Sequence, residues 1–151
     1  SIIALSRQNL PLVRHENKAE NLCSRGGYII KRSSQQRTKV TIVATGSEVS
    51  IALNAQSKLE KGNITTCVVS MPCLDIFNAQ NEKYQNSVIT PESDVIVVEA
   101  GVQQSWDKLL GKSGAFIGMD NFGASAPAKD LFNHYKITAE EIIKVATKNF
   151  V

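Results

Sequence analysis

Short runs of β-branched and apolar residues alternate along this chain with segments whose apolar residues recur every three or four positions. The pattern is clearest where the run Val40–Val43 leads through a turn at Gly46 into a helix that Gly62 would end. One stripe of that helix is apolar and is expected to face the sheet, formed by Ala52, Ala55 and Leu59. A strand that leads into an amphipathic helix predicts a parallel crossover, and therefore an α/β sheet.

Further runs of the same kind predict five strands, at residues 28–31, 40–43, 65–70, 95–99 and 115–119. Helices are expected at residues 49–61, 80–88 and 104–110, and two more after Ser125, the second opening with the capping box Thr138–Glu141. Residues 32–38 are too few for a parallel crossover, so we expect the first strand to run antiparallel to the second. The predicted fold is a three-layer α/β domain, with a five-stranded, mostly parallel mixed sheet, one antiparallel strand and helices on both faces.

The start of the chain suggests a piece of a longer protein. It opens without Met on the residues SIIAL, which are typical of a strand whose partners are missing. The segment from Val13 to Arg25 is polar and lacks periodicity, as linkers do. We predict that residues 1–13 are the tail of a preceding domain, residues 14–25 an interdomain linker, and residues 26–151 a single domain.

Composition excludes several classes of function. The net charge of +3 is small and its lysines and arginines are scattered, which argues against nucleic acid as a partner. No apolar run approaches the roughly 20 residues of a membrane helix, so no membrane is expected. Three cysteines without CxxC spacing favour reduced thiols and a cytoplasmic location. The only histidines, His15 and His134, are far apart, so we expect no metal site.

The turn that precedes the first long helix is the first candidate for chemistry. Free N–H groups at a helix N-terminus after a parallel strand can bind a phosphate or a nucleotide, here at Gly46, Ser47 and Glu48. The alternative is that Glu48 itself occupies these donors, as the second partner of a capping box that begins at Thr45. Because neither GxGxxG nor a P-loop lysine is present, we favour the second interpretation.

Other polar and aromatic residues offer weaker signals. Glu99 ends a buried strand, and with Asp75 or Asp120 it would give a carboxylate pair for acid–base work. We prefer the interpretation that Glu99 accepts hydrogen bonds from neighbouring turn amides, because no base, nucleophile or metal ligand accompanies it. No serine lies in a nucleophile elbow of the GxSxG kind, so hydrolase chemistry has no support in this chain. Trp106 and Phe122 are both predicted to lie in the core.

Arg7 lies in a polar turn between an apolar strand and Pro11. A planar guanidinium held on a turn suits bidentate recognition of phosphate or carboxylate. The composition of the turn alone does not separate such a role from a surface ion pair.

Six stretches together resemble the carboxyl-terminal part of transketolase. They are ALSRQNLP (residues 4–11), GGYII (26–30), IVATGSEV (42–49), VVSMP (68–72), VEAG (98–101) and MDNFGASAP (119–127). The resemblance implies a thiamine diphosphate enzyme that uses magnesium or calcium to transfer a two-carbon ketol unit from a ketose phosphate to an aldose phosphate. Its carboxyl-terminal domain is a five-stranded mixed α/β domain that contributes to homodimer contacts.

By this resemblance, residues 1–13 end a pyrimidine-binding domain, and Arg7 takes the place of the arginine that binds the phosphate of the sugar substrate. The cofactor, metal and proton-transfer residues would lie in upstream domains of the full-length chain. The chain alone is then expected to bind no cofactor, to be inactive and to have a structural role in dimerisation. Lys136 departs from the family, in which many relatives have Gly.

Two alternatives stay open at this point. The domain could be a regulatory module that binds a small anion or a nucleotide at Gly46–Glu48. It could instead be the carboxyl-terminal part of a pyruvate dehydrogenase β-type subunit, which shares the domain architecture, although SRQNLP and FGASAP favour transketolase.

Overall fold

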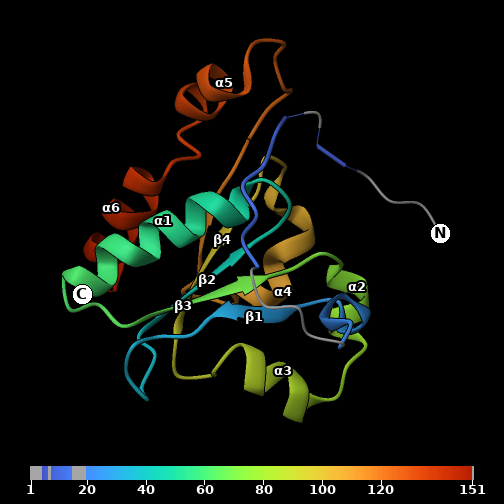
Figure 1. The fold of residues 1–151 in the computed structure, drawn as a ribbon, viewed down its shortest axis with the longest axis vertical. Coiled ribbons are helices and arrows are strands. Elements are labelled where there is room, and N and C mark those ends of the chain that lie inside the picture. Colours follow the sequence, from blue (N-terminus) through green and yellow to red (C-terminus); the bar gives the residue numbers. More distant parts are fainter. Residues whose placement is uncertain (1–4, 7, 15–19, 151) are drawn as a thin grey trace.

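Five strands form one open sheet in the computed structural model, which describes residues 5–6, 8–14 and 20–150 (Figure 1). They lie in the order β1-β3-β2-β4-β5. Strands β2 to β5 are mutually parallel, and β1 pairs antiparallel with β3. Their bounds are β1 (Tyr28–Lys31), β2 (Val40–Ala44), β3 (Thr66–Ser70), β4 (Asp94–Val98) and β5 (Ala115–Ile117).

The central strands are apolar because both faces of the sheet are covered. Every residue of β2 is buried, and Ile42 lies opposite Val68 of β3 on one side and Ile96 of β4 on the other. Alternate side chains of each strand enter two separate hydrophobic clusters, one on each face, as the period of two in a strand requires. Continuous apolar runs are the sequence signature of such doubly covered parallel strands.

Helices cover both faces of the sheet, which confirms the predicted fold class (Figure 1). The first face carries α1 (Glu48–Lys61), α5 (Ala128–His134) and α6 (Ala139–Asn149). The other face carries α2 (Leu74–Asn78), α3 (Glu82–Val88), the 3-10 turn η2 (Gln103–Trp106) and α4 (Asp107–Leu110). Among the described residues, no helix has the length and hydrophobicity that crossing a membrane requires.

The first strand has the predicted direction but a different neighbour from the one its position in the sequence suggests. It runs antiparallel to β2, yet it pairs with β3, the strand beyond β2. The parallel crossover through α1 places β3 directly beside β2, so β1 takes the free edge of β3. Gln56 of α1 fixes the chain after β1, because its amide donates to the carbonyls of Arg32 (3.1 Å) and Thr66 (2.7 Å).

Two glycines allow the chain to enter β1 closely against the neighbouring segment. Gly26 has a φ of +81°, and a Cβ atom there would lie 2.3 Å from the backbone nitrogen of Phe77. A Cβ at Gly27 would lie 2.5 Å from the sulfur of Met71. At Gly26 only glycine fits without moving the backbone of α2, whereas a side chain at Gly27 would displace the Met71 side chain. The short turn η1 (Leu22–Arg25) precedes them, inside the segment predicted as a linker.

Helices α1 and α5 end in the same way. Each closes with a Schellman motif, in which the N–H of Ile64 bonds to the carbonyl of Leu59, and that of Ile137 to the carbonyl of Phe132 (both 2.9 Å). The motif places the residue before each isoleucine in the left-handed region, and these residues are Asn63 (φ 61°) and Lys136 (φ 57°). The predicted stop of α1 at Gly62 is confirmed, since Gly62 is its C-cap.

The predicted starts of the last two helices have different outcomes. Thr138 caps α6 as expected, because its hydroxyl oxygen accepts from the N–H of Glu141 at 3.2 Å. Ser125, expected near the start of α5, lies outside that helix, which begins at Ala128 with Pro127 as its N-cap and without a side-chain cap bond.

Candidate functional site

The order of the strands defines one place where a site can form. From β2 the chain passes through α1 on one face to β3, whereas from β4 it passes through η2 and α4 on the other face to β5. Adjacent parallel strands whose connections leave in opposite directions open a crevice at their carboxyl ends. Here that crevice lies between the turn after β2, residues 45–48, and the turn after β4, residues 99–101.

A buried carboxylate occupies this crevice. Glu48, the first residue of α1, is only 4% exposed. Burial is the largest influence on its carboxyl group and raises its pKa, and the nearby charge of Glu99 acts in the same direction. Hydrogen bonds from its own backbone N–H, the Ser47 hydroxyl and the Ala100 N–H lower the pKa, but they offset the burial only in part.

The helix start differs in detail from the predicted capping box. Ser47 is the N-cap of α1, and no side chain caps this helix. Thr45 contributes its carbonyl, which accepts from the Glu48 N–H at 3.0 Å, and not its hydroxyl. A carboxylate of the protein itself, that of Glu48, therefore lies buried at this helix start. The binding of an added phosphate at Gly46, Ser47 and Glu48 stays a prediction.

Glu99 is joined to an indole and not to the turn amides that we expected. Its Oε2 accepts from Nε1 of Trp106 at 2.6 Å, and Trp106 is 3% exposed, so its predicted place in the core is confirmed. The pairing links the end of β4 to η2, which covers the opposite face of the sheet from α1. Trp106 follows Glu99 by only seven residues. Because a buried indole N–H usually has a hydrogen-bond partner, a carboxylate so near in the sequence is the signal that sequence analysis could have used.

A pocket of about 270 Å³ opens beside Glu48. Its wall combines the turn after β2, Ala100 after β4, Met119 after β5, and residues of α5 with the loop before it. Gln8 also lines it, so the amino-terminal segment passes over this end of the sheet. Most of the lining is apolar, and Glu48 is its one carboxylate among the described residues.

Other predicted site residues lie elsewhere. Arg7, the expected phosphate ligand, falls outside the described residues. Asp75 is in the first turn of α2, and Asp120 is exposed in the loop after β5, so neither is paired with Glu99 in any hydrogen bond of the described chain. Among the described residues, no three of His, Cys, Asp and Glu gather where they could hold a metal ion.

The prediction that Phe122 lies in the core is wrong. Its side chain is 96% exposed, on the loop between β5 and α5. The carbonyl of the same residue accepts a hydrogen bond from the Tyr135 hydroxyl at 3.0 Å, so the backbone of the loop is anchored while the ring faces outward. An isolated aromatic residue gives no periodic signal by which a sequence distinguishes the two environments.

Solved structures resemble this chain in both fold and sequence. A transketolase mutant from Pichia stipitis superposes with a TM-score of 0.81 at 35% identity, covering 95% of this chain and 20% of that chain. Transketolase from Campylobacter jejuni gives 0.73 at 28% identity, again over 95% of this chain and 20% of that one. The fold is therefore that of an α/β domain found within transketolases.

Sequence comparison leads to the same family. The chain is 45% identical over 148 residues to transketolase from Rhodobacter capsulatus, covering 94% of this chain and 22% of the relative. It is 41% identical over 147 residues to transketolase 2 of Escherichia coli, covering 97% of this chain and 22% of the relative. The family model of the transketolase-like TK C-terminal domain matches residues 26–138, so the chain belongs to that family. It spans about a fifth of the length of these curated relatives.

Proposed function

We propose that this chain is the carboxyl-terminal structural domain of a thiamine diphosphate-dependent transketolase, and that it does not catalyse ketol transfer by itself. The observation that carries the proposal is the family match over residues 26–138, on a chain that covers only about a fifth of each relative. The crevice at the carboxyl ends of β2 and β4 also supports the proposal. The polar group buried there is a carboxylate of the protein itself, that of Glu48.

The chemistry of the complete enzyme would come from a cofactor held by upstream domains. Thiamine diphosphate and magnesium or calcium would together supply the carbanion chemistry that moves the two-carbon unit. The described residues of this chain bring together no ligand set for a divalent cation, so no step of the reaction is assigned to them. Two related Pichia stipitis transketolase structures are complexes with sedoheptulose 7-phosphate and xylulose 5-phosphate, which makes sugar phosphates the proposed substrates.

Arg7 is the one residue of this chain to which we assign a substrate contact. The assignment rests on its place in the SRQNLP motif, and a guanidinium suits a phosphate monoester. In the complete enzyme, we expect Arg7→Gln to raise the KM for a ketose phosphate roughly tenfold or more, and Arg14→Gln to change it little. Steady-state kinetics measures both variants, and an unchanged KM in the Arg7 variant would remove Arg7 from the site.

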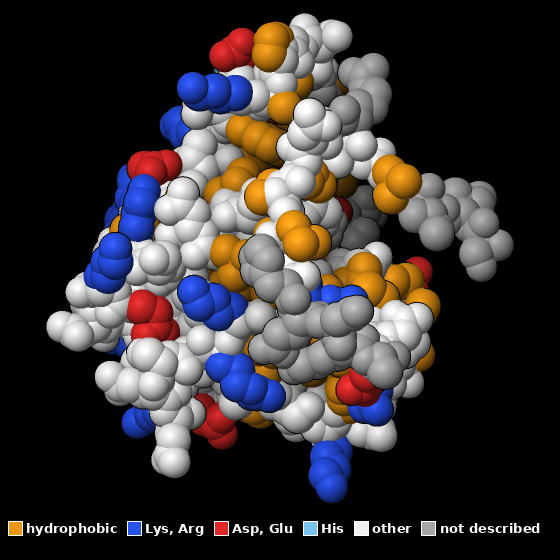
Figure 2. Space-filling view, in the orientation of Figure 1, with side chains coloured by type: hydrophobic (Ala, Val, Ile, Leu, Met, Phe, Trp, Pro, Cys, Tyr) orange, Lys and Arg blue, Asp and Glu red, His pale blue; other side chains and the backbone are white. Residues whose placement is uncertain are grey.

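We infer that the upstream domains dock against the carboxyl edge of the sheet. The amino-terminal segment lies at this edge, because Gln8 lines the same pocket as Gly123 and Ala124 of the loop after β5. That loop and segment carry several exposed large apolar side chains, namely Phe122, Leu5, Leu10 and Leu12. Figure 2 shows apolar side chains gathered on the upper part of the visible face, around the segment that leads into the domain. Exposed apolar groups next to a chain entry are what a domain interface requires.

The substitution Phe122→Ser separates docking from folding. In the isolated chain it should leave the melting temperature within about 1 °C, because a 96% exposed ring loses almost no contact on truncation. In the complete enzyme it should lower the melting temperature and shift sedimentation toward smaller species, because the ring would then be covered. Equal effects in both proteins would exclude the docking role of this loop.

Calorimetric titration with thiamine diphosphate and magnesium tests where the cofactor binds. The isolated chain should give no saturable heat, whereas the complete enzyme should give a binding isotherm under the same conditions. Tight, stoichiometric binding by the isolated chain would overturn the assignment of the cofactor to upstream domains.

A further inference from the structure

The loop between β1 and β2, residues 32–38, is a mostly exposed segment at the amino edge of the sheet, where β2 begins (Figure 1). It contains no helix or strand, and outside the sheet no backbone–backbone hydrogen bond involves its residues. Its position therefore depends on side chains. Nothing in the transketolase assignment gives this loop a role.

Two side chains of α1 hold the loop. The amide of Gln56 donates to the carbonyl of Arg32 at 3.1 Å. The carboxylate of Glu60 accepts from the hydroxyl of Ser34 and also from its N–H, which lies 3.4 Å from each carboxylate oxygen. The same carboxylate accepts from the Thr66 N–H of β3 at 2.6 Å. Glu60 therefore joins the loop both to α1 and to the sheet.

The Glu60 carboxylate is charged at neutral pH. Burial acts to raise its pKa, but hydrogen bonds from the Ser34 hydroxyl and the Thr66 N–H more than offset the burial, so its pKa lies below the ordinary value of 4.5. A negative group attached to the Ser34 oxygen would face this charge directly. Phosphorylation at such a position replaces an attraction by a repulsion between like charges.

The residues before Ser34 carry two positive charges. Lys31 lies three positions and Arg32 two positions before it, and both side chains are exposed, as Ser34 is. Kinases with an acidic substrate groove select such patterns through charge complementarity. They bind the substrate segment in an extended form, which an exposed loop without regular structure can adopt.

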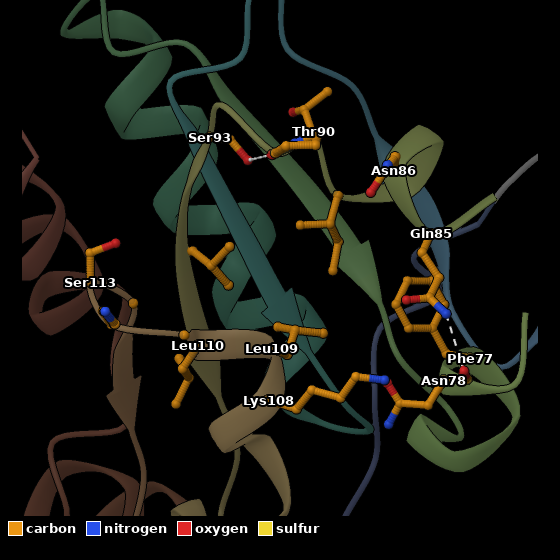
Figure 3. Close-up of a pocket in the computed structure, with 16 residues that line it drawn as sticks. Phe77, Asn78, Gln85, Asn86, Thr90, Ser93, Lys108, Leu109, Leu110 and Ser113 are labelled. Atoms are coloured by element: carbon orange, nitrogen blue, oxygen red, sulfur yellow. Dashed lines mark hydrogen bonds between the residues drawn. The ribbon is translucent and has the colours of Figure 1, made fainter. Parts of the chain in front are cut away.

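Ser113 offers a comparison within the same chain. It is exposed and follows a lysine, Lys112, and it lines the pocket of about 310 Å³ between α3 and α4 (Figure 3). Its turn is closed by a bond of 2.9 Å from the Gly114 N–H to the Leu110 carbonyl. The residues three and two positions before it are Leu110 and Gly111, so this serine lacks the charge pattern.

We propose that Ser34 is a phosphorylation site for a serine kinase that selects basic residues, and that its phosphorylation releases residues 32–38 from α1. The Ser34 oxygen attacks the γ-phosphorus of ATP, so that a new O–P bond forms, the bond between the γ-phosphorus and its bridging oxygen breaks, and ADP leaves. The hydroxyl proton passes to the catalytic carboxylate of the kinase. The product places about two negative charges beside Glu60, and the serine no longer donates.

Incubation of the 151-residue chain with ATP, magnesium and cyclic AMP-dependent protein kinase, a kinase of this selectivity, tests the site. Mass spectrometry of the digested chain should locate the phosphate on Ser34. Ser34→Ala should reduce the incorporation about tenfold or more, and Ser113→Ala should leave it unchanged. No incorporation, or incorporation that persists in Ser34→Ala, would overturn the proposal.

Two matched double variants separate recognition of the loop from the effect of net charge. Lys31→Gln with Arg32→Gln should lower the rate of phosphorylation about tenfold or more, because both charges would enter the acidic groove of the kinase. Lys83→Gln with Lys148→Gln removes the same charge from exposed positions on α3 and α6 and should change the rate less than about twofold. Equal loss in the two double variants would contradict recognition of this loop.

Thermal unfolding and amide NMR of the phosphorylated chain test the release from α1. The melting temperature should fall by about 2–4 °C and the Thr66 amide signal should shift, because a repulsion replaces the bond between Ser34 and Glu60. In Glu60→Gln, which removes the facing charge, phosphorylation should lower the melting temperature less. An unchanged melting temperature in the natural chain, or equal losses in the two proteins, would contradict the release. The loop lies at the opposite edge of the sheet from the proposed docking surface, so these outcomes are independent of the proposed function.

Discussion

Glu48 is the residue whose environment most directly links burial to pH dependence. Its pKa is raised above the ordinary value near 4.5, chiefly by burial, so the folded protein holds this proton more tightly than the unfolded chain does. Between the ordinary pKa and the raised one, folding binds a proton, and stability falls as the pH rises. The contribution of Glu48 is therefore most favourable below the ordinary pKa and declines through the raised value.

Replacement by glutamine tests this sign. The unfolding free energy of the natural chain minus that of Glu48→Gln should be largest near pH 4 and should decrease toward pH 7, because glutamine does not ionise. Urea unfolding at several pH values measures the difference, and Glu82→Gln, an exposed position in the first turn of α3, is the control. A difference that grows with pH would contradict a raised pKa.

The bond between Glu99 and Trp106 predicts a cost that depends on the acceptor. Glu99→Leu leaves the buried indole N–H without its 2.6 Å partner and should lower the unfolding free energy by about 1–2 kcal/mol. Glu99→Gln keeps an acceptor oxygen and should cost less. Trp106 is the only tryptophan, so its fluorescence reports both the unfolding transition and any exposure of the ring. Equal costs in the two variants would show that this bond contributes little.

At the residue scale, the sequence predicts the features that depend on neighbouring residues in the chain. It does not predict the environments that depend on contacts between distant segments. The sequence places Glu48 at the start of α1, but the capping box from Thr45 that led to this prediction is not formed, because Ser47 is the N-cap. The approach of Ala100 and Glu99 to that carboxylate depends on the pairing of β2 with β4, which local pattern does not encode. The exposure of Phe122 likewise depends on what covers a loop, and not on the type of residue.

At the scale of elements, the backbone at the end of α5 is strained at one residue, and a substitution can relieve this strain. Lys136 holds the left-handed position of a Schellman motif, which disfavours any residue with a Cβ. Lys136→Gly should raise the unfolding free energy by about 0.5–1 kcal/mol, since relief of strain exceeds the entropy cost of glycine. Asn63→Gly at the equivalent position of α1 should gain less, because asparagine tolerates this conformation. Thermal unfolding of both variants measures this, and a loss of stability in Lys136→Gly would contradict the assignment of strain.

The elements themselves follow from periodicity more faithfully than their pairing does. All five strands and the long helix α1 lie close to their predicted residues, because burial on both faces selects β-branched runs and burial on one face selects a helical stripe. The position of β1 beside β3 was not predictable from loop length. The short connection of residues 32–38 excludes a parallel crossover, so it predicts that β1 runs antiparallel to β2. It does not determine which strand of the sheet β1 pairs with.

At the scale of the whole molecule, the two edges of the sheet have different characters. The carboxyl edge holds a buried carboxylate, the entry of the chain and exposed apolar side chains, which suits docking of upstream domains. The amino edge holds an open pocket between α3 and α4, with Lys108 and Lys112 among its lining residues. Membership of the transketolase C-terminal domain family accounts for the fold, and the docking role of the carboxyl edge stays a proposal.

Ketol transfer measured with and without upstream domains tests the central claim most directly. The 151-residue chain is assayed with thiamine diphosphate, magnesium, xylulose 5-phosphate and ribose 5-phosphate, beside a hybrid in which it replaces the carboxyl-terminal domain of Escherichia coli transketolase 2, a 41% identical relative. The hybrid should transfer the two-carbon unit and the isolated chain should not. Turnover by the isolated chain would contradict the assignment of the chemistry to upstream domains.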